Sequence, residues 1–319
     1  MVRSLASLIS PSGARARLSI LIFHRVLETH DPLFPDLPTG QEFERMMEWI
    51  RRWFNVLPLA EAASRLTSGS LPSRPLCITF DDGYADNATV ATPILAKLGL
   101  TGTFFVCPGF LEGGRMWNDD VIESLRVCRA ESIDLQRFGL REMPLRTPEQ
   151  KRNAIEAILR RIKHLPYVER ARQVKEIVAS VGGNAGPDLM MTHEQLRKTH
   201  AAGMTIGGHT ATHPILTRLE SGLAYREIAA GKEQLEGIIG TSVDVFAYPN
   251  GVPAQDYTAE HVNMARRCGF RCAVSTAWGA ASRRTDVFQL PRFTPWSRQR
   301  TRFALQLLSN LAKRHVVTV

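Results

Sequence analysis

Short apolar runs alternate along the chain with longer stretches in which apolar residues recur every three or four positions. The runs have the length of buried strands, and several end in polar residues or glycine, which predicts parallel strands with polar groups at their carboxyl ends. The predicted strands lie at 18–23, 55–57, 76–80, 101–106, 204–206, 243–247, 271–275 and 288–290. Helical spacing is shown by Phe43, Met46 and Ile50, after a capping box formed by Thr39 and Glu42. Roughly seven or eight strands alternating with helices favour an α/β fold, an irregular (β/α)7-8 barrel, over an open sheet.

The alternation breaks off between about 108 and 186, where loops and two predicted helices take its place. These helices lie at 148–164 and 167–181, and Pro166 separates them because its ring cannot continue a helix. We expect a mostly helical insertion that is carried on a single domain extending over 1–319 and that shapes the substrate groove.

The composition is that of an ordinary globular protein, large enough to bury a full core. The chain has 319 residues, of which 44% are hydrophobic and 22% charged. It contains no run of about 18 apolar residues, so no transmembrane helix is predicted. The apolar patch within 1–10 is too short for the core of a signal peptide. We therefore expect a cytoplasmic or membrane-peripheral protein.

Cysteine content and charge argue against several classes of site. The five cysteines include no Cys-x-x-Cys pair, so neither a disulfide scaffold nor a cysteine-rich zinc site is predicted, and we interpret them as small core residues. The net charge of +9 is compatible with nucleic acid, anionic lipid or an acidic polymer as partner. The basic residues are dispersed and form no motif interleaved with aromatic residues, so no nucleic-acid partner is expected.

Two adjacent carboxylates, Asp81 and Asp82, follow the predicted strand 76–80 and precede a turn at Gly83. In a parallel barrel this end of a strand is the edge where ligands bind. Like charges side by side repel, and burying either one requires a nearby donor or cation. A structural interpretation also exists, in which one aspartate caps the following helix.

Two imidazoles four residues apart, His209 and His213, follow the predicted strand 204–206. This spacing is that of metal ligands on a helix, but two preceding glycines and Pro214 indicate a strand-end loop or a single turn. In a barrel, the acidic pair and the histidine pair would lie on the same face. One carboxylate with two imidazoles makes a three-ligand metal site with room for water.

Three motifs in order resemble those of the NodB-like polysaccharide deacetylases, carbohydrate esterase family four. The first is Thr79-Phe80-Asp81-Asp82-Gly83, the second His209-Thr210-x-x-His213, and the third Phe246-Ala247-Tyr248-Pro249-Asn250-Gly251. The opening Ile22-Phe23-His24-Arg25 resembles that of a permuted branch of the family. The resemblance covers 75–110 and 190–293 and leaves the insertion uncovered.

The resemblance implies the NodB homology fold and a metal-dependent hydrolase that removes N-acetyl groups from N-acetylhexosamine units of a polysaccharide or glycan precursor. It implies that a divalent metal, usually Zn²⁺, is bound by Asp82, His209 and His213. It further implies Asp81 as general base, and a backbone N–H of Asn250 as oxyanion donor. Tyr248 and Pro249 belong to the same predicted substrate-binding segment.

Three further residues have two interpretations each. His24 is expected to be the general acid, since His315, near the C-terminus where the family usually has this histidine, resembles no motif; alternatively, His24 is a core histidine. Arg292 is expected to hold the base, because Ala247 occupies the usual arginine position, or it is a surface arginine. Trp117 is expected to contact sugar through its indole face, in a segment whose Asp119 also suits a helix N-cap.

Two other functions fit the same motifs. One is an amidohydrolase of this fold that acts on a small non-sugar amide. The other is an inactive glycan-binding module, which is disfavoured because both carboxylates and both imidazoles are present. The sequence specifies neither the glycan nor the oligomeric state.

Overall fold

The computed structural model describes residues 1–182, 186, 188–313 and 315–319, and within them the chain divides into two compact units. The first unit comprises Met1–Thr29, Pro38–Glu112 and Met191–Val319. The second comprises His30–Leu37 and Gly113–Met190. The predicted insertion, 108–186, overlaps most of the second unit; residues 183–185 of that prediction lie outside the described residues.

The first unit is built on a parallel sheet. Its strands are β1 (Ser19–Phe23), β2 (Asn55–Val56), β3 (Pro75–Phe80), β4 (Thr103–Val106), β7 (Thr205–Gly208), β8 (Val245–Ala247) and β9 (Cys272–Val274). They follow the order β1-β3-β4-β7-β8-β9, and β2 pairs only with the start of β3. Because every pairing is parallel, the carboxyl ends of the strands meet at one edge.

The ring of strands is completed by an extended segment in place of the strand predicted at 288–290, so that prediction is wrong. Leu290 forms an isolated bridge to Val274 of β9, and Phe293 forms one to Leu21 of β1. Residues 287–289 lie in a turn in which the Gln289 N–H donates to the Asp286 carbonyl at 2.8 Å. Pro291, between the two bridges, has no backbone N–H to donate, so a continuous ladder does not form. The segment nevertheless links the two ends of the sheet, and the predicted irregular (β/α) barrel is confirmed.

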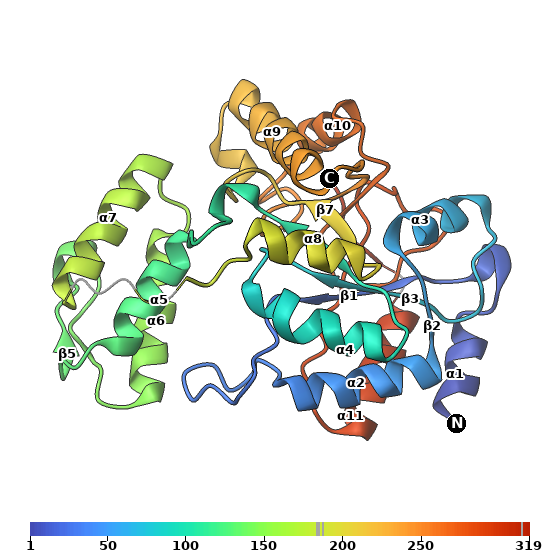
Figure 1. The fold of residues 1–319 in the computed structure, drawn as a ribbon, viewed down its shortest axis with the longest axis horizontal. Helices are drawn as coiled ribbons and strands as arrows, with labels where there is room; N and C mark the ends of the chain where they lie inside the picture. The colour runs from blue at the N-terminus through green and yellow to red at the C-terminus, as the bar shows by residue number, and fades with distance from the viewer. Residues whose placement is uncertain (183–185, 187, 314) are drawn as a thin grey trace. The chain divides into compact units, whose positions relative to one another are not determined.

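Helices pack around this sheet, with α2, α4, α9 and α10 among those visible in Figure 1. The helices of the first unit are α1 (Val2–Ile9), α2 (Gly40–Trp53), α3 (Leu59–Ser68), α4 (Thr92–Lys97), α8 (His193–Ala201), α9 (Ser221–Ile239), α10 (Ala259–Arg267) and α11 (Arg300–Ala312). The capping box of Thr39 and Glu42 is present at the start of α2, as predicted. Before α4, residues Asn87–Ala91 form a π-helical turn that the sequence did not predict.

Alternate residues of each strand point to opposite sides of the sheet. In β3 and β4, Phe80 and Phe104 belong to the buried cluster that includes residues of α2, α9 and α11, and their rings stack with centroids 4.6 Å apart. Cys77 and Phe105, which have the opposite parity, belong to a second buried cluster with Ala247 and Val274. This second cluster fills the interior of the ring.

The second unit has a small core of its own. Its elements are α5 (Trp117–Val127), β5 (Ser132–Ile133), β6 (Met143–Pro144), α6 (Pro148–Ile162) and α7 (Tyr167–Ser180). The two predicted helices correspond to α6 and α7. The segment His30–Leu37 joins this core through buried Leu33, and Asp31 forms an ion pair with Arg126 at 2.8 Å.

Two expectations about composition can be compared with the structure. All five cysteines are unpaired and four of them are buried, as expected of small core residues. Among the described residues, no helix combines the length and the apolar character needed to span a bilayer.

Replacing Phe104 by alanine should test the stacked aromatic layer. The ring is fully buried against Phe80, so Phe104→Ala should lower the free energy of unfolding by about 3–5 kcal/mol. Leu305→Ala is the control, because Leu305 is 61% exposed and should change that free energy by about 0.5 kcal/mol or less. Urea unfolding of both variants measures the difference, and equal midpoints would contradict the expectation.

Candidate metal centre and catalytic site

The acidic pair lies in a tight turn directly after β3. Asp82 has φ 81° and Gly83 has φ 90°, and a Cβ atom at Gly83 would come within 2.8 Å of Val106 Cγ1. A side chain at this position would displace the Val106 side chain, and the left-handed backbone also favours glycine. Asp81 has the parity of Cys77, so its side chain faces the interior of the ring. The left-handed backbone at Asp82 turns its side chain in a different direction from that of Asp81, so the two carboxylates need not share one position.

The histidine pair lies in a loop directly after β7, and no helix is formed there. Thr210 and His213 both have left-handed backbones, with φ 63° and 54°. The Thr210 hydroxyl oxygen accepts a hydrogen bond from the His213 backbone N–H at 3.0 Å. The prediction of a strand-end loop is therefore confirmed.

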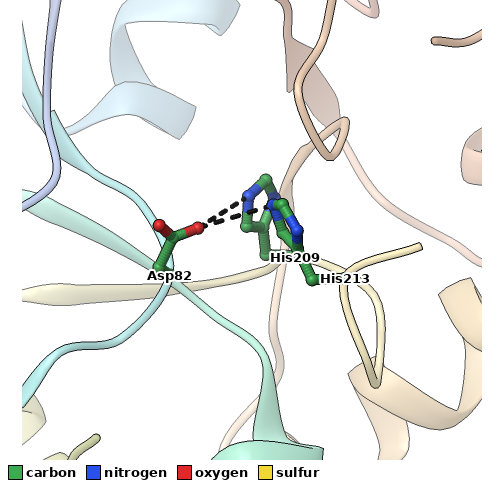
Figure 2. A group of neighbouring side chains, drawn as sticks. All are labelled: Asp82, His209 and His213. Atoms are coloured by element: carbon green, nitrogen blue, oxygen red, sulfur yellow. Dashed lines mark ion pairs between the residues drawn. The ribbon is translucent and has the colours of Figure 1, made fainter. Parts of the chain in front are cut away.

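These two loops bring one carboxylate and two imidazoles together, as Figure 2 shows. Asp82 Oδ1 lies 3.5 Å from Nε2 of His209 and 3.5 Å from Nε2 of His213. The candidate ligand atoms of the three residues all lie within 4.8 Å of one another. No other group of three or more potential metal ligands is found among the described residues.

The backbone carbonyl of Ala247 fixes the orientation of His209. His209 Nδ1 lies 2.7 Å from this oxygen, which can only accept a hydrogen bond. Nδ1 therefore carries a proton, and Nε2 faces Asp82. A histidine ligand oriented by a carbonyl in this way is typical of metal sites.

Burial and charge act in opposite directions on the ionisation of the three residues. Burial would raise the pKa of Asp82, but the two imidazoles outweigh it and hold that pKa well below its ordinary value. Burial lowers the pKa of His213 to about 4, so this imidazole is neutral at neutral pH. Burial also opposes a charge on His209, yet Asp81 and Asp82 raise the pKa of His209. The site therefore favours one positive charge between these residues, which a proton or a metal can supply.

Arg292 forms a buried two-point ion pair with Asp81. Its Nη1 and Nη2 donate to Oδ1 and Oδ2 of Asp81 at 2.6 and 2.7 Å, and Nε donates to the Ser275 carbonyl at 2.9 Å. The arginine is 0% exposed, so the surface interpretation of Arg292 is wrong. Burial would raise the pKa of Asp81, but the guanidinium more than offsets it and the pKa is lowered. Asp81 is therefore ionised at neutral pH.

His24 directly follows β1 and is exposed, so the interpretation as a core histidine is wrong. The side-chain amide of buried Asn87 donates to the His24 carbonyl at 2.8 Å and fixes the backbone there. The His24 imidazole is close enough to act electrostatically on both Asp81 and Asp82. It therefore lies at the same strand edge as the acidic pair.

The third motif contributes through its backbone. The Tyr248 side chain is fully buried, stacks on Tyr257 with centroids 4.0 Å apart, and donates to the Phe288 carbonyl at 3.0 Å. The Tyr248 side chain therefore packs in the core, and the assignment of Tyr248 to a substrate-binding segment stays a prediction. Pro249 is also buried, and Asn250 has φ 59° with its carbonyl held by Thr276 Oγ1 at 2.8 Å.

Trp117 belongs to the second unit, where it begins α5. It is therefore not among the residues that the first unit brings together. The Arg170 guanidinium lies 4.9 Å from the centroid of the Trp117 ring, a cation–π contact that occupies indole surface. The expected sugar contact of Trp117 stays a prediction.

Comparison with known proteins decides the family. The model of the polysaccharide deacetylase family matches residues 68–273, which include the acidic pair, the histidine pair and the third motif. The chain belongs to the polysaccharide deacetylase family. This membership confirms the predicted enzyme class, a deacetylase among the hydrolases.

Individual proteins resemble the chain over most of its length. YxkH of Bacillus subtilis (strain 168), a polysaccharide deacetylase by name, is 23% identical over 279 residues, which are 87% of this chain and 71% of that protein. The solved Streptococcus pyogenes deacetylase PplD, in complex with acetate, superposes with a TM-score of 0.61 at 18% identity and covers 93% of this chain and 98% of its own. IcaB from Ammonifex degensii gives 0.59 at 19% identity, with 95% and 99% covered. These two structures share the fold of the chain.

Two contributions to this deacetylase site were not predicted from sequence. The carbonyl of Ala247 orients His209. From the sequence, Ala247 was considered only because it occupies the position of the usual arginine. Glu227 of α9 contacts the loop between the two histidines, although a lone acidic residue on a helix has no distinguishing pattern. A backbone contact carries no side-chain signal, so the first was not accessible to pattern analysis at all.

Removing the guanidinium should destabilise this deacetylase. Arg292→Ala leaves the buried carboxylate of Asp81 without its partner, and we expect the free energy of unfolding to fall by about 3–5 kcal/mol at pH 7. The free energy of unfolding of Arg292→Lys should lie between those of the wild type and Arg292→Ala, because an ammonium keeps the charge but cannot reproduce the two parallel hydrogen bonds. Urea unfolding of the metal-free proteins measures both.

The same variants predict a dependence on pH. The folded-state pKa of Asp81 lies below its unfolded value of about 3.9, so the stabilisation is fully present above that value and is lost as the pH falls through the folded-state pKa. The difference between wild type and Arg292→Ala should therefore be constant near neutrality and shrink in acid. A difference that stayed the same down to about pH 2 would show that Asp81 is not the titrating partner.

Proposed function

We propose that the protein is a metal-dependent hydrolase that removes N-acetyl groups from N-acetylhexosamine units of a polysaccharide or glycan precursor. The observation that carries this proposal is the pairing of two differently equipped carboxylates at one strand edge. Asp82 faces two imidazoles, while Asp81 is held by Arg292. Membership of the polysaccharide deacetylase family supports the class of substrate.

The donor set fits a divalent cation, and Zn²⁺ is our choice. One carboxylate oxygen and two imidazole nitrogens, from Asp82, His209 and His213, form the three-ligand set of catalytic zinc sites. His213 is neutral at neutral pH, and His209 directs Nε2 toward the carboxylate while Nδ1 donates to the Ala247 carbonyl, so each ring presents a nitrogen that can bind metal. A divalent ion at such a site supplies Lewis-acid polarisation of an amide carbonyl and a lowered pKa of water.

Asp81 is the general base in this proposal. It is ionised because Arg292 lowers its pKa, and its Oδ2 lies 3.9 Å from His209 Nε2, beside the proposed ligands. A carboxylate in this position accepts a proton from the attacking water. The two hydrogen bonds from Arg292 fix the plane of the carboxylate, so the base is oriented before substrate binds.

His24 is the general acid that protonates the departing amine. Its exposed position after β1, at the same edge as β3, supports this role and the placement of the chain in the permuted branch of the family. Nothing comparable supports His315, which lies in the irregular segment after α11.

Asn250 supplies a backbone N–H to the developing oxyanion. The left-handed backbone at Asn250 and the hydrogen bond from Thr276 to its carbonyl fix the peptide orientation in this turn. A preorganised backbone donor stabilises negative charge without reorganisation during the reaction. In this proposal the partner of the protein is a glycan, which membership of the polysaccharide deacetylase family supports.

The substrate class is tested by incubating the purified protein and Zn²⁺ with N-acetylglucosamine oligomers or peptidoglycan fragments. We expect release of equal amounts of acetate and free amine, because hydrolysis of the amide produces one of each. The Asp82→Ala protein is the control and should release neither. If no acetate or amine were released from any of these substrates, with bound metal confirmed by elemental analysis, the sugar assignment would be refuted but the proposed metal site would not.

The division of roles is tested by comparing metal content with turnover. Asp82→Ala, His209→Ala and His213→Ala should lose metal, since each removes one proposed ligand. His24→Ala should retain metal and lose about 10²–10⁴-fold in turnover, as expected when a general acid is removed. His315→Ala serves as its matched control and should remain active. A fully active His24→Ala protein would show that the general acid lies elsewhere.

A further inference from the structure

Helix α9 approaches the backbone of the loop that carries both histidines. At Gly231, a Cβ atom would come within 2.6 Å of the Thr210 carbonyl carbon and 2.8 Å of the Ala211 nitrogen. Real Cβ atoms essentially never approach backbone atoms so closely, so any other residue at 231 would push the loop away from the helix. The absence of a side chain at this one position allows the loop to lie directly on the helix.

This close approach gives the loop access to Glu227, one turn earlier in α9. The Ala211 backbone N–H donates to the Glu227 carbonyl at 2.9 Å. The Thr212 backbone N–H donates to Glu227 Oε2 at 2.8 Å, and the Thr212 hydroxyl donates to Oε1 at 2.9 Å. One residue of the helix thus accepts three hydrogen bonds from the two residues at the centre of the loop.

The loop requires such support because its backbone is strained. Thr210 and His213 are non-glycine residues in the left-handed region, at φ 63° and 54°. Side chains disfavour this conformation, and it persists only where surrounding contacts enforce it. Among the hydrogen bonds found within the loop for the described residues, only those of the Thr210 hydroxyl stabilise this conformation. From outside the loop, the Gly109 N–H donates to the Ala211 carbonyl at 2.9 Å, and the contacts of Ala211 and Thr212 with α9 add to this constraint.

We propose that Glu227 and Gly231 are positioning residues of the metal site, and that they set its metal affinity by holding His209 and His213 in register with Asp82. The inference rests on the proposed function, because it takes these three residues as metal ligands. Glu227 touches neither imidazole. It acts through the main chain of Ala211 and Thr212, which lie between the two ligands.

Metal affinity of the folded variants tests this inference. Zn²⁺ binding to the metal-free full-length protein is measured by competition with a chromogenic chelator, alongside thermal unfolding of the same samples. Glu227→Ala removes two of the three hydrogen bonds and Gly231→Ala displaces the loop, so each should weaken Zn²⁺ binding about 10–100-fold. In Glu227→Gln, the amide oxygen still accepts from the Thr212 N–H and the amide nitrogen donates to the Thr212 hydroxyl. Glu227→Gln should therefore retain near-wild-type affinity.

Matched controls lie on the same helix. Gly237→Ala adds the same methyl group where no atom lies within 4 Å, and Glu233→Gln makes the same replacement at an exposed position. Neither should change Zn²⁺ affinity. If Glu227→Ala and Gly231→Ala fold and bind Zn²⁺ as tightly as wild type, the inference is wrong. If Gly231→Ala does not fold, Glu227→Ala compared with Glu227→Gln decides the question. A wild-type protein without Zn²⁺ affinity would overturn the proposed metal site, and this inference with it.

Discussion

Two carboxylates on consecutive residues are buried at the end of one strand, and the rest of the site is organised around the free-energy cost of keeping both ionised. Such charges repel each other, and burial removes the water that would stabilise them. Arg292 compensates Asp81 through two hydrogen bonds, whereas His209 and His213 face Asp82. One carboxylate therefore has a permanent cation as partner, and the other has a site suited to a metal. This difference in partners gives two identical side chains different chemistry.

The barrel makes this arrangement possible because its parallel strands end at one edge. The acidic pair follows β3, the histidine pair follows β7 and His24 follows β1. Several of the residues at this edge have left-handed backbones, with φ 81° at Asp82, 63° at Thr210 and 59° at Asn250. Conformations of this kind cost roughly 1–3 kcal/mol each and persist only where the surroundings enforce them. The packed ring and the helices around it supply that enforcement, so the stability of the fold is partly used to orient the site.

Sequence patterns predicted those parts of the molecule that depend on local residue type. The strands that carry Asp81 and His209, the capping box of Thr39 and the two helices of the insertion were all predicted correctly, because turn residues and apolar spacing are local signals. The strand predicted at 288–290 was wrong, because apolar character alone does not show that 286–289 form a turn, in which the Gln289 N–H donates to the Asp286 carbonyl. The contacts of Ala247 and Glu227 were not predicted, since they depend on which backbones meet in space. The burial of Tyr248 was missed for the same reason.

The small side chain of Ala247 is compatible with the position of the Arg292 guanidinium in the interior of the ring. Ala247 belongs to the cluster that fills the interior of the ring, so an arginine there would extend toward the space that the Arg292 guanidinium occupies. Asp81 offers its two oxygens to a single guanidinium, and a second buried guanidinium would lack a counter-charge. With a small residue at 247, the strand keeps its interior packing while its carbonyl orients His209. Because the guanidinium comes from the closing segment, β8 remains free to orient the proposed metal ligand His209, and the segment that completes the barrel also holds the proposed base.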